Sequence, residues 1–247
     1  MFDARGRALP FNEIRGAFSL FSWSLAVLVK PVAERVIHLV VLYPSITPNL
    51  VTAIGLTLRL TVALLFFVGN KHTLFSGALV YYCVAVLDAV DGPLARLTGC
   101  TSEFGRYFDH ISDLVGDFLI LSALAVGLGL VFEPVVIGML FMHIAESYIS
   151  YVTNIALNVR SADEIRFLDG KGGLVEVFIR YRQYFFQKNL KSFISFPDYA
   201  LLTFMFFPMA GNAAMGLYVG FGILLLSTLY TILSTFAALH SSATKFP

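Results

Sequence analysis

Two long apolar runs separated by a short turn decide the fold of this chain. They read TLFSGALVYYCVAVLDAVDGPLARL over residues 73–97 and SEFGRYFDHISDLVGDFLILSALAVGLGLV over residues 102–131. Each run is longer than the ~20 residues that an α-helix needs to cross a bilayer. The few residues between the runs leave room only for a turn. The sequence therefore predicts a hairpin of two membrane-spanning helices.

The composition of the whole chain is that of a membrane protein. Of its 247 residues, 57% are hydrophobic and only 13% are charged, whereas a soluble domain carries about 25% charged residues. This balance excludes a disordered chain, a nucleic-acid-binding protein with a basic surface and an ordinary cytosolic domain. Besides the hairpin, apolar runs predict further spans over about 48–69, 135–158, 197–210 and 213–239. We expect an all-α polytopic membrane protein with six transmembrane helices.

Two segments outside the spans are predicted to lie on the membrane surface. Basic residues interrupt the apolar run near the N-terminus, so residues 12–43 are interpreted as one or two interfacial amphipathic helices. A tilted first span is the alternative. Residues 159–196 form a polar, basic cytoplasmic loop, and their later part, 174–193, predicts a second surface helix. The chain thus divides into an interfacial segment, residues 1–47, and a six-helix membrane domain, residues 48–247.

Lysine and arginine counts predict the orientation, because these residues are enriched on the cytoplasmic side of membrane proteins. If the N-terminus is cytoplasmic, all but two of the 17 basic residues lie on that side. The exceptions are Lys71, on the other side, and Arg59, within a span. We therefore expect both termini, and the turn inside the helix hairpin, to face the cytoplasm.

Acidic residues fall inside the predicted spans, where an ionised carboxylate costs several kcal/mol unless it is paired, hydrated or bound to a metal. They are Asp88, Asp91, Asp109, Asp113, Asp117 and Glu146. The two aspartates of the first hairpin helix are spaced i,i+3, and the three of the second are spaced i,i+4, so each set shares a helix face. The hairpin would bring both faces together about 10–20 Å below the cytoplasmic surface.

This aspartate cluster predicts a metal site. Several carboxylates that meet in a low dielectric cannot all stay ionised without cations. Oxygen ligands without a cysteine or histidine quartet favour Mg²⁺, Mn²⁺ or Ca²⁺ over zinc. Two divalent ions would neutralise four aspartates, and such a pair suits the transfer of a phosphorus group. Polar contacts between helices are the competing interpretation, which explains a lone aspartate better than it explains this cluster.

The residues between the two sets of aspartates point to a bound phosphate. Gly92 and Pro93 weaken a helix and indicate a bend where a ligand or backbone approaches. Ala95 leaves room, and Arg96 is placed to bind phosphate oxygens at the cytoplasmic rim. Gly105, on the opposite helix, permits a close approach.

Residues 88–113 resemble the signature of the CDP-alcohol phosphotransferase family, D-x2-D-G-x2-A-R-x8-G-x3-D-x3-D. Every fixed position and every spacing agrees. The likeness extends in organisation to most of the chain, including P-N-x2-T at the start of the first span, the amphipathic N-terminus and the six spans. Outside residues 48–113 it is a likeness of topology rather than of motifs.

The resemblance implies an enzyme of phospholipid synthesis that transfers a substituted phosphate from a CDP-alcohol to a second alcohol and releases CMP. It also implies two divalent ions, Mg²⁺ or Mn²⁺, and a homodimer. The implied metal ligands are Asp88, Asp91 and Asp109, while Asp113 would complete the metal site or deprotonate the attacking hydroxyl. The implied nucleotide and phosphate contacts are Gly92, Ala95, Gly105 and Arg96.

The signature leaves the two alcohols open. The donor that we expect is CDP-diacylglycerol, with a small polar alcohol as acceptor; the alternative is CDP-choline or CDP-ethanolamine acting on diacylglycerol. Because the last three spans carry no lysine or arginine at depth, an unphosphorylated acceptor is favoured. Glu146 would receive a cationic amine, or would simply pair with Arg59 or His143. The candidate acceptor residues are Arg59, Glu146, Arg160 and Arg166.

A divalent-cation or proton-coupled transporter is the alternative from another class, because it also needs buried acidic residues. That alternative does not explain the glycines, the alanine and the arginine at their fixed spacings in the signature. The chain also lacks an obvious inverted repeat, which many transporters have.

Overall fold

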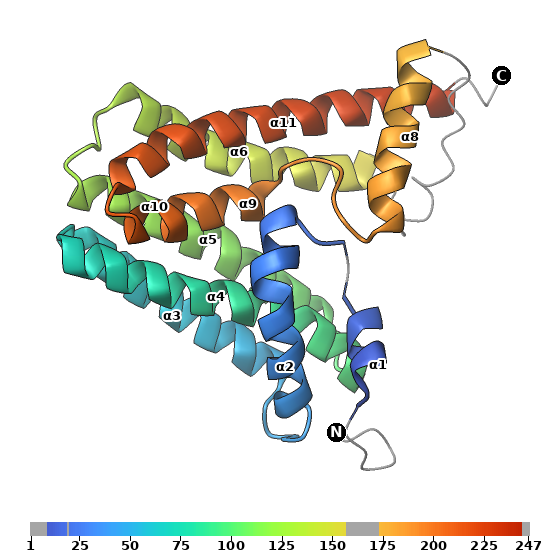
Figure 1. Cartoon of the computed structure of the whole chain (residues 1–247), viewed down its shortest axis with the longest axis horizontal. Coiled ribbons are helices and arrows are strands. Elements are labelled where there is room, and N and C mark those ends of the chain that lie inside the picture. Colours follow the sequence, from blue (N-terminus) through green and yellow to red (C-terminus); the bar gives the residue numbers. More distant parts are fainter. Residues whose placement is uncertain (1–8, 19, 157–172, 244–247) are drawn as a thin grey trace.

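The computed structural model describes residues 9–18, 20–156 and 173–243, and the named elements in these ranges are all helices (Figure 1). Within these described ranges, five helices are long and apolar enough to cross a membrane. They are α3 (Pro48–Val68), α4 (Lys71–Thr98), α5 (Glu103–Gly127), α6 (Pro134–Ala156) and α11 (Ala213–Ala243). They run along the long axis of the molecule. The expected all-α polytopic membrane fold is confirmed.

The span predicted from Pro197 onward is not confirmed, so neither is the count of six. One continuous helix lies there, formed by α9 (Phe196–Leu201), the π-helical turn η2 (Leu202–Phe206) and α10 (Phe207–Met209). It measures only about 21 Å at 1.5 Å per residue, against a hydrocarbon core of ~30 Å. This short helix packs against α4 and α11.

The N-terminal surface segment is helical and lies across the bundle. α1 (Phe11–Gly16) is followed by η1 (Leu25–Val29) and α2 (Lys30–Val40), and Figure 1 shows α2 running across the long helices. α2 packs against α4, while Leu39 on its outer side is 59% exposed. Its position at a membrane surface stays a prediction.

The helix predicted over residues 174–193 is α8 (Gly173–Gln187), which is shorter than predicted. It stops before residue 193 because the following backbone pairs with the N-terminal segment. The Phe21 N–H donates to the Asn189 carbonyl at 3.1 Å, and the Lys191 N–H donates to the Phe21 carbonyl at 2.8 Å. Asn189 takes a left-handed conformation, with φ 54°.

Close packing around α3 positions the helix hairpin. α3 contacts both α4 and α5. A Cβ atom on Gly127 would lie 2.0 Å from the Phe66 carbonyl oxygen, so only glycine permits this approach of α5 to α3. α4 continues without interruption through Gly92 and Pro93 and ends at Gly99, which has φ 67°.

Candidate active site

Three of the predicted metal ligands lie together inside the hairpin. Asp88 of α4 and Asp109 and Asp113 of α5 each offer one carboxylate oxygen, and these oxygens lie within 4.8 Å of one another. The Asp88 and Asp113 side chains are 34% and 36% exposed, so an ion can reach them. Three hard oxygen donors at this separation fit Mg²⁺ or Mn²⁺.

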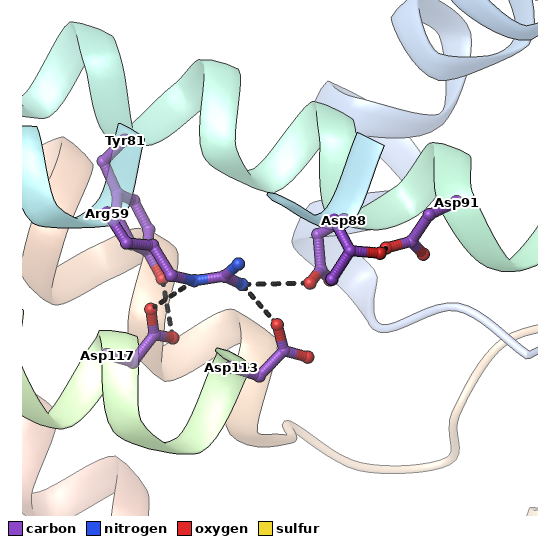
Figure 2. A network of polar contacts seen from close by, with 7 residues as sticks. Arg59, Tyr81, Asp88, Asp91, Asp113 and Asp117 are labelled. Carbon is purple, nitrogen blue, oxygen red and sulfur yellow. Dashed lines mark hydrogen bonds and ion pairs between the residues drawn. The ribbon is translucent and has the colours of Figure 1, made fainter. Parts of the chain in front are cut away.

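The fourth predicted ligand, Asp91 of α4, is hydrogen-bonded to a residue of α3. It is buried, and its carboxylate accepts a hydrogen bond of 2.7 Å from the Thr52 hydroxyl. Figure 2 shows this carboxylate directed toward that of Asp88. The only sequence signal for Thr52 was its place in the P-N-x2-T pattern, and no role was predicted for it.

Arg59 of α3 belongs to the aspartate cluster (Figure 2). Its Nη2 atom lies 3.0 Å from Asp88 Oδ1 and 2.6 Å from Asp113 Oδ1. Its Nε atom lies 3.2 Å from Asp117 Oδ1. The Tyr81 hydroxyl donates to the second oxygen of Asp117 at 3.1 Å. The salt bridges of Arg59 are thus made with aspartates and not with Glu146.

The predicted nucleotide and phosphate contacts surround the end of the hairpin that carries its turn. Arg96 is exposed, and its Nε atom donates to the Ala17 carbonyl at 2.7 Å. A Cβ atom on Gly105 would lie 3.0 Å from Asn49 Oδ1, so α5 passes close to the start of α3. The roles of Gly92, Ala95, Arg96 and Gly105 toward a nucleotide stay predictions.

A cavity of about 1050 Å³ opens beside the aspartates. One side, the aspartate wall, consists of Arg59, Tyr81, Asp88, Asp113 and Asp117. The opposite side, the hydroxyl wall, comes from α6, the 191–197 segment and α11. Its polar residues are Glu146, Ser147, Ser150, Thr153, Lys191, Ser192, Ser195, Ser227, Tyr230, Thr231, Ser234 and Thr235. This volume matches the upper end of small-molecule sites.

Glu146 and Lys191 are the charged residues of the hydroxyl wall. Glu146 is 7% exposed and accepts a hydrogen bond of 2.9 Å from the Ser150 hydroxyl. Burial lowers the pKa of the Lys191 ammonium, and the carboxylates of Glu146 and Asp198 oppose that shift. The other two predicted acceptor residues, Arg160 and Arg166, lie outside the described residues.

Asp198 links the N-terminal segment to the hydroxyl wall by hydrogen bonds to Ser24 and to the wall residue Ser195. One oxygen of this carboxylate accepts from the Ser24 backbone and hydroxyl, at 2.8 and 2.6 Å, and the other accepts from the Ser195 backbone at 2.9 Å. The Trp23 indole N–H donates to the Lys191 carbonyl at 3.1 Å. Ser24 lies 174 residues from Asp198 along the chain, so no local sequence pattern indicates this contact.

The sequence matches the CDP-alcohol phosphatidyltransferase family over residues 45–238, a range that contains both walls of the cavity. The chain belongs to this family. It is therefore an enzyme that transfers a substituted phosphate group, and the transporter alternative is set aside.

Named relatives show which branches of the family are similar. The archaetidylinositol phosphate synthase of Pyrococcus horikoshii is 41% identical over 83 residues, which are 34% of this chain and 43% of that protein. The phosphatidylinositol phosphate synthase of Mycobacterium tuberculosis is 29% identical over 170 residues, 68% of each chain. A crystal structure of the Mycobacterium tuberculosis enzyme with CDP-DAG bound is 24% identical, with a TM-score of 0.49, over 87% of this chain and 92% of that one. At this TM-score and identity, side-chain positions in that crystal structure cannot be assigned to residues of this chain.

Proposed function

We propose that this protein transfers a phosphatidyl group from CDP-diacylglycerol to a small polar alcohol and releases CMP. The observation that carries the proposal is the group of oxygens from Asp88, Asp109 and Asp113, within 4.8 Å of one another, two of whose residues, Asp88 and Asp113, line a cavity of about 1050 Å³. The relatives are named for lipid–inositol phosphate products. Those names support a CDP-lipid donor rather than CDP-choline or CDP-ethanolamine.

The aspartates would hold Mg²⁺ or Mn²⁺. The ligands would be Asp88, Asp91, Asp109 and Asp113, and the bound ions would offset the charge of the donor's pyrophosphate. With Asp117 and Arg59 included, the cluster carries a formal charge of −4, from five carboxylates and one guanidinium. Two divalent ions balance that charge.

Asp113 is the proposed base. Its carboxylate is oriented by Arg59, which lies 2.6 Å from Oδ1, and it would accept the proton of the acceptor hydroxyl. In the reaction the alcohol oxygen bonds to the phosphorus that carries diacylglycerol, and the bond from this phosphorus to CMP breaks. A positioned base contributes about 10²–10⁴-fold to such a step.

The hydroxyl wall is the proposed acceptor site. Its serine, threonine and tyrosine hydroxyls both donate and accept hydrogen bonds, as a polyhydroxy alcohol requires. Glu146 adds a buried acceptor, and Arg59 is already bound by aspartates. These features favour a neutral alcohol. The names of the relatives favour a second candidate, an inositol phosphate, whose phosphate would need Lys191 or the predicted residues Arg160 and Arg166.

We also propose that the active site and both termini face the cytoplasm and that the protein forms a homodimer. α2 and α8 lie toward the same end of the long-helix bundle (Figure 1). The sequence segments that contain these two helices, residues 1–47 and 159–196, carry most of the basic residues. Such a bias supports a cytoplasmic active site and cytoplasmic termini. The homodimer implied by the resemblance is kept as a proposal.

The acceptor can be identified with the purified protein, CDP-diacylglycerol and Mn²⁺. Inositol, serine, choline, glycerol 3-phosphate and inositol phosphate would be added singly, and the lipid product identified by mass spectrometry. We expect a product with an unphosphorylated alcohol. A product with inositol phosphate alone would replace the neutral acceptor by the second candidate. No product with any alcohol would overturn the proposed function.

A further inference from the structure

We infer that Arg59 is a positioning residue of the metal centre: fixed by Asp117, it holds Asp88 and Asp113 ready for two divalent ions. This inference rests on the proposed function only in taking the aspartate cluster as a metal centre. Arg59 would touch neither the ions nor the substrates, and it would act through the two carboxylates that it binds.

A single nitrogen of Arg59 connects the two helices of the hairpin. Its Nη2 atom binds Asp88 of α4 at 3.0 Å and Asp113 of α5 at 2.6 Å. The same guanidinium binds Asp117 through Nε at 3.2 Å. Because the guanidinium is a rigid planar fork, fixing Nε also fixes Nη2. One oxygen of Asp88 and one oxygen of Asp113 are thereby set in place. The second oxygen of each carboxylate would be available to a metal ion.

Asp117 serves as the anchor of this fork rather than as a metal ligand. Both of its oxygens are engaged by protein donors, one by Arg59 and the other by the Tyr81 hydroxyl. Its side chain is 6% exposed, as is that of Arg59. A buried carboxylate with two such partners is paired within the protein. The other four aspartates carry the charge that two divalent ions balance.

Gly116 provides the space through which Arg59 reaches the aspartates. A Cβ atom at this position would lie 2.4 Å from Arg59 Cδ and 3.3 Å from Arg59 Cβ, so an alanine would displace the side chain. On α3 itself, a Cβ atom on Gly55 would lie 3.6 Å from Arg59 Nη1, which is ordinary contact. The path of Arg59 therefore depends on one glycine of α5.

The opposite role for Arg59 would be that of a competitor, whose positive charge occupies the place of a metal ion. The double variant Arg59→Met/Asp117→Asn separates the two roles, because it removes one positive and one negative charge and leaves the cluster at −4. Mn²⁺ binding to the detergent-purified protein would be followed by electron paramagnetic resonance of the free ion, without substrate.

We expect the double variant to bind Mn²⁺ about 10–100-fold more weakly, which is the usual cost of losing a group that orients metal ligands. Arg59→Lys, which keeps the charge but loses the fork, is expected to lie between the double variant and the wild type. Affinity equal to or tighter than that of the wild type in the double variant would overturn the inference and establish the competitor.

Gly116→Ala tests the same inference without changing any polar group, and it decides the matter if the double variant does not fold. Its matched control is Gly222→Ala on α11, where a Cβ atom would meet nothing within 4 Å. We expect weaker Mn²⁺ binding for the first variant and unchanged binding for the second, with both eluting as folded protein in size-exclusion chromatography. Wild-type affinity in Gly116→Ala would overturn the inference. A wild-type protein that binds Mn²⁺ but releases no CMP would instead overturn the proposed function.

Discussion

The two walls of the cavity differ in how their polar groups are held. On the aspartate wall, charged groups from three helices bind one another, as in the pairing of Arg59 with Asp88, Asp113 and Asp117. On the hydroxyl wall, several hydroxyls donate to a carbonyl of the preceding turn of their own helix, as Thr231 does to the Ser227 carbonyl at 3.0 Å; Ser147, Ser227 and Ser234 do the same.

This difference matches two tasks. Charge that develops during a reaction is best stabilised by groups that are already fixed in place. A polar alcohol that enters and leaves is better served by hydroxyls whose hydrogen bonds exchange with little movement. We therefore expect damage to the aspartate wall to reduce kcat and metal affinity, and damage to the hydroxyl wall to raise the KM for the alcohol.

The largest effect should follow from Asp113→Asn on the aspartate wall. Removing the proposed base should lower kcat by about 10²–10⁴-fold, while CDP-diacylglycerol still binds. CMP release and equilibrium binding of the donor would be measured side by side. Glu103→Gln on the same helix is the control, because that side chain is 95% exposed. Activity of Asp113→Asn within tenfold of the wild type would remove Asp113 from the role of base.

The next effect should follow from Thr52→Val, which removes the hydroxyl that binds Asp91 and nearly preserves the shape. We expect about 10–100-fold more Mn²⁺ to be needed for half-maximal activity. Thr57→Val is the matched control, because Thr57 lies on the same helix, is exposed, and bonds only to the Ala53 carbonyl. Equal metal requirements in the two variants would contradict the role of Thr52.

On the hydroxyl wall, Glu146→Gln should raise the KM for the acceptor about tenfold, as expected for losing a hydrogen bond to a charged group. The KM for CDP-diacylglycerol should stay unchanged. Steady-state kinetics with each substrate varied in turn would separate the two constants. Glu133→Gln, in the turn before α6, serves as the control. If the KM for the donor rose instead, Glu146 would contact the donor and not the acceptor, which would contradict its proposed role.

The smallest effect should follow from Ser24→Ala, which removes one of the two hydrogen bonds from Ser24 to Asp198 and leaves the backbone one. We expect the acceptor KM to rise by no more than about fivefold. Trp23 is the only tryptophan of the chain and contacts the same segment, so its emission reports a loosened contact. A larger rise in KM with unchanged Trp23 emission would show that Ser24 acts elsewhere.

The fold was largely predictable, because the lengths of the apolar runs determine where helices can cross a membrane. α3 begins at Pro48 and α11 begins at Ala213, both as expected. The span predicted from Pro197 is not confirmed: its composition is apolar like that of a span, but the helix there, Phe196–Met209, is short and packs against α4 and α11.

The site was predictable as far as helical spacing reaches. Asp109 and Asp113 share a face because they are one turn apart, and the hairpin turn brings Asp88 to them. The pairing of Arg59 with Asp117 was not predictable, because it joins residues 58 positions apart and depends on the depth at which α3 meets Gly116. Spacing within one helix carries no information about that depth.

We propose that the aspartate wall supports a metal-dependent transfer to an alcohol bound on the hydroxyl wall. CMP release from CDP-diacylglycerol by the purified protein tests it most directly, measured with and without Mn²⁺ and with and without the alcohol. We expect CMP only when metal and alcohol are both present. CMP release without metal, or at the same rate without any alcohol, would contradict it.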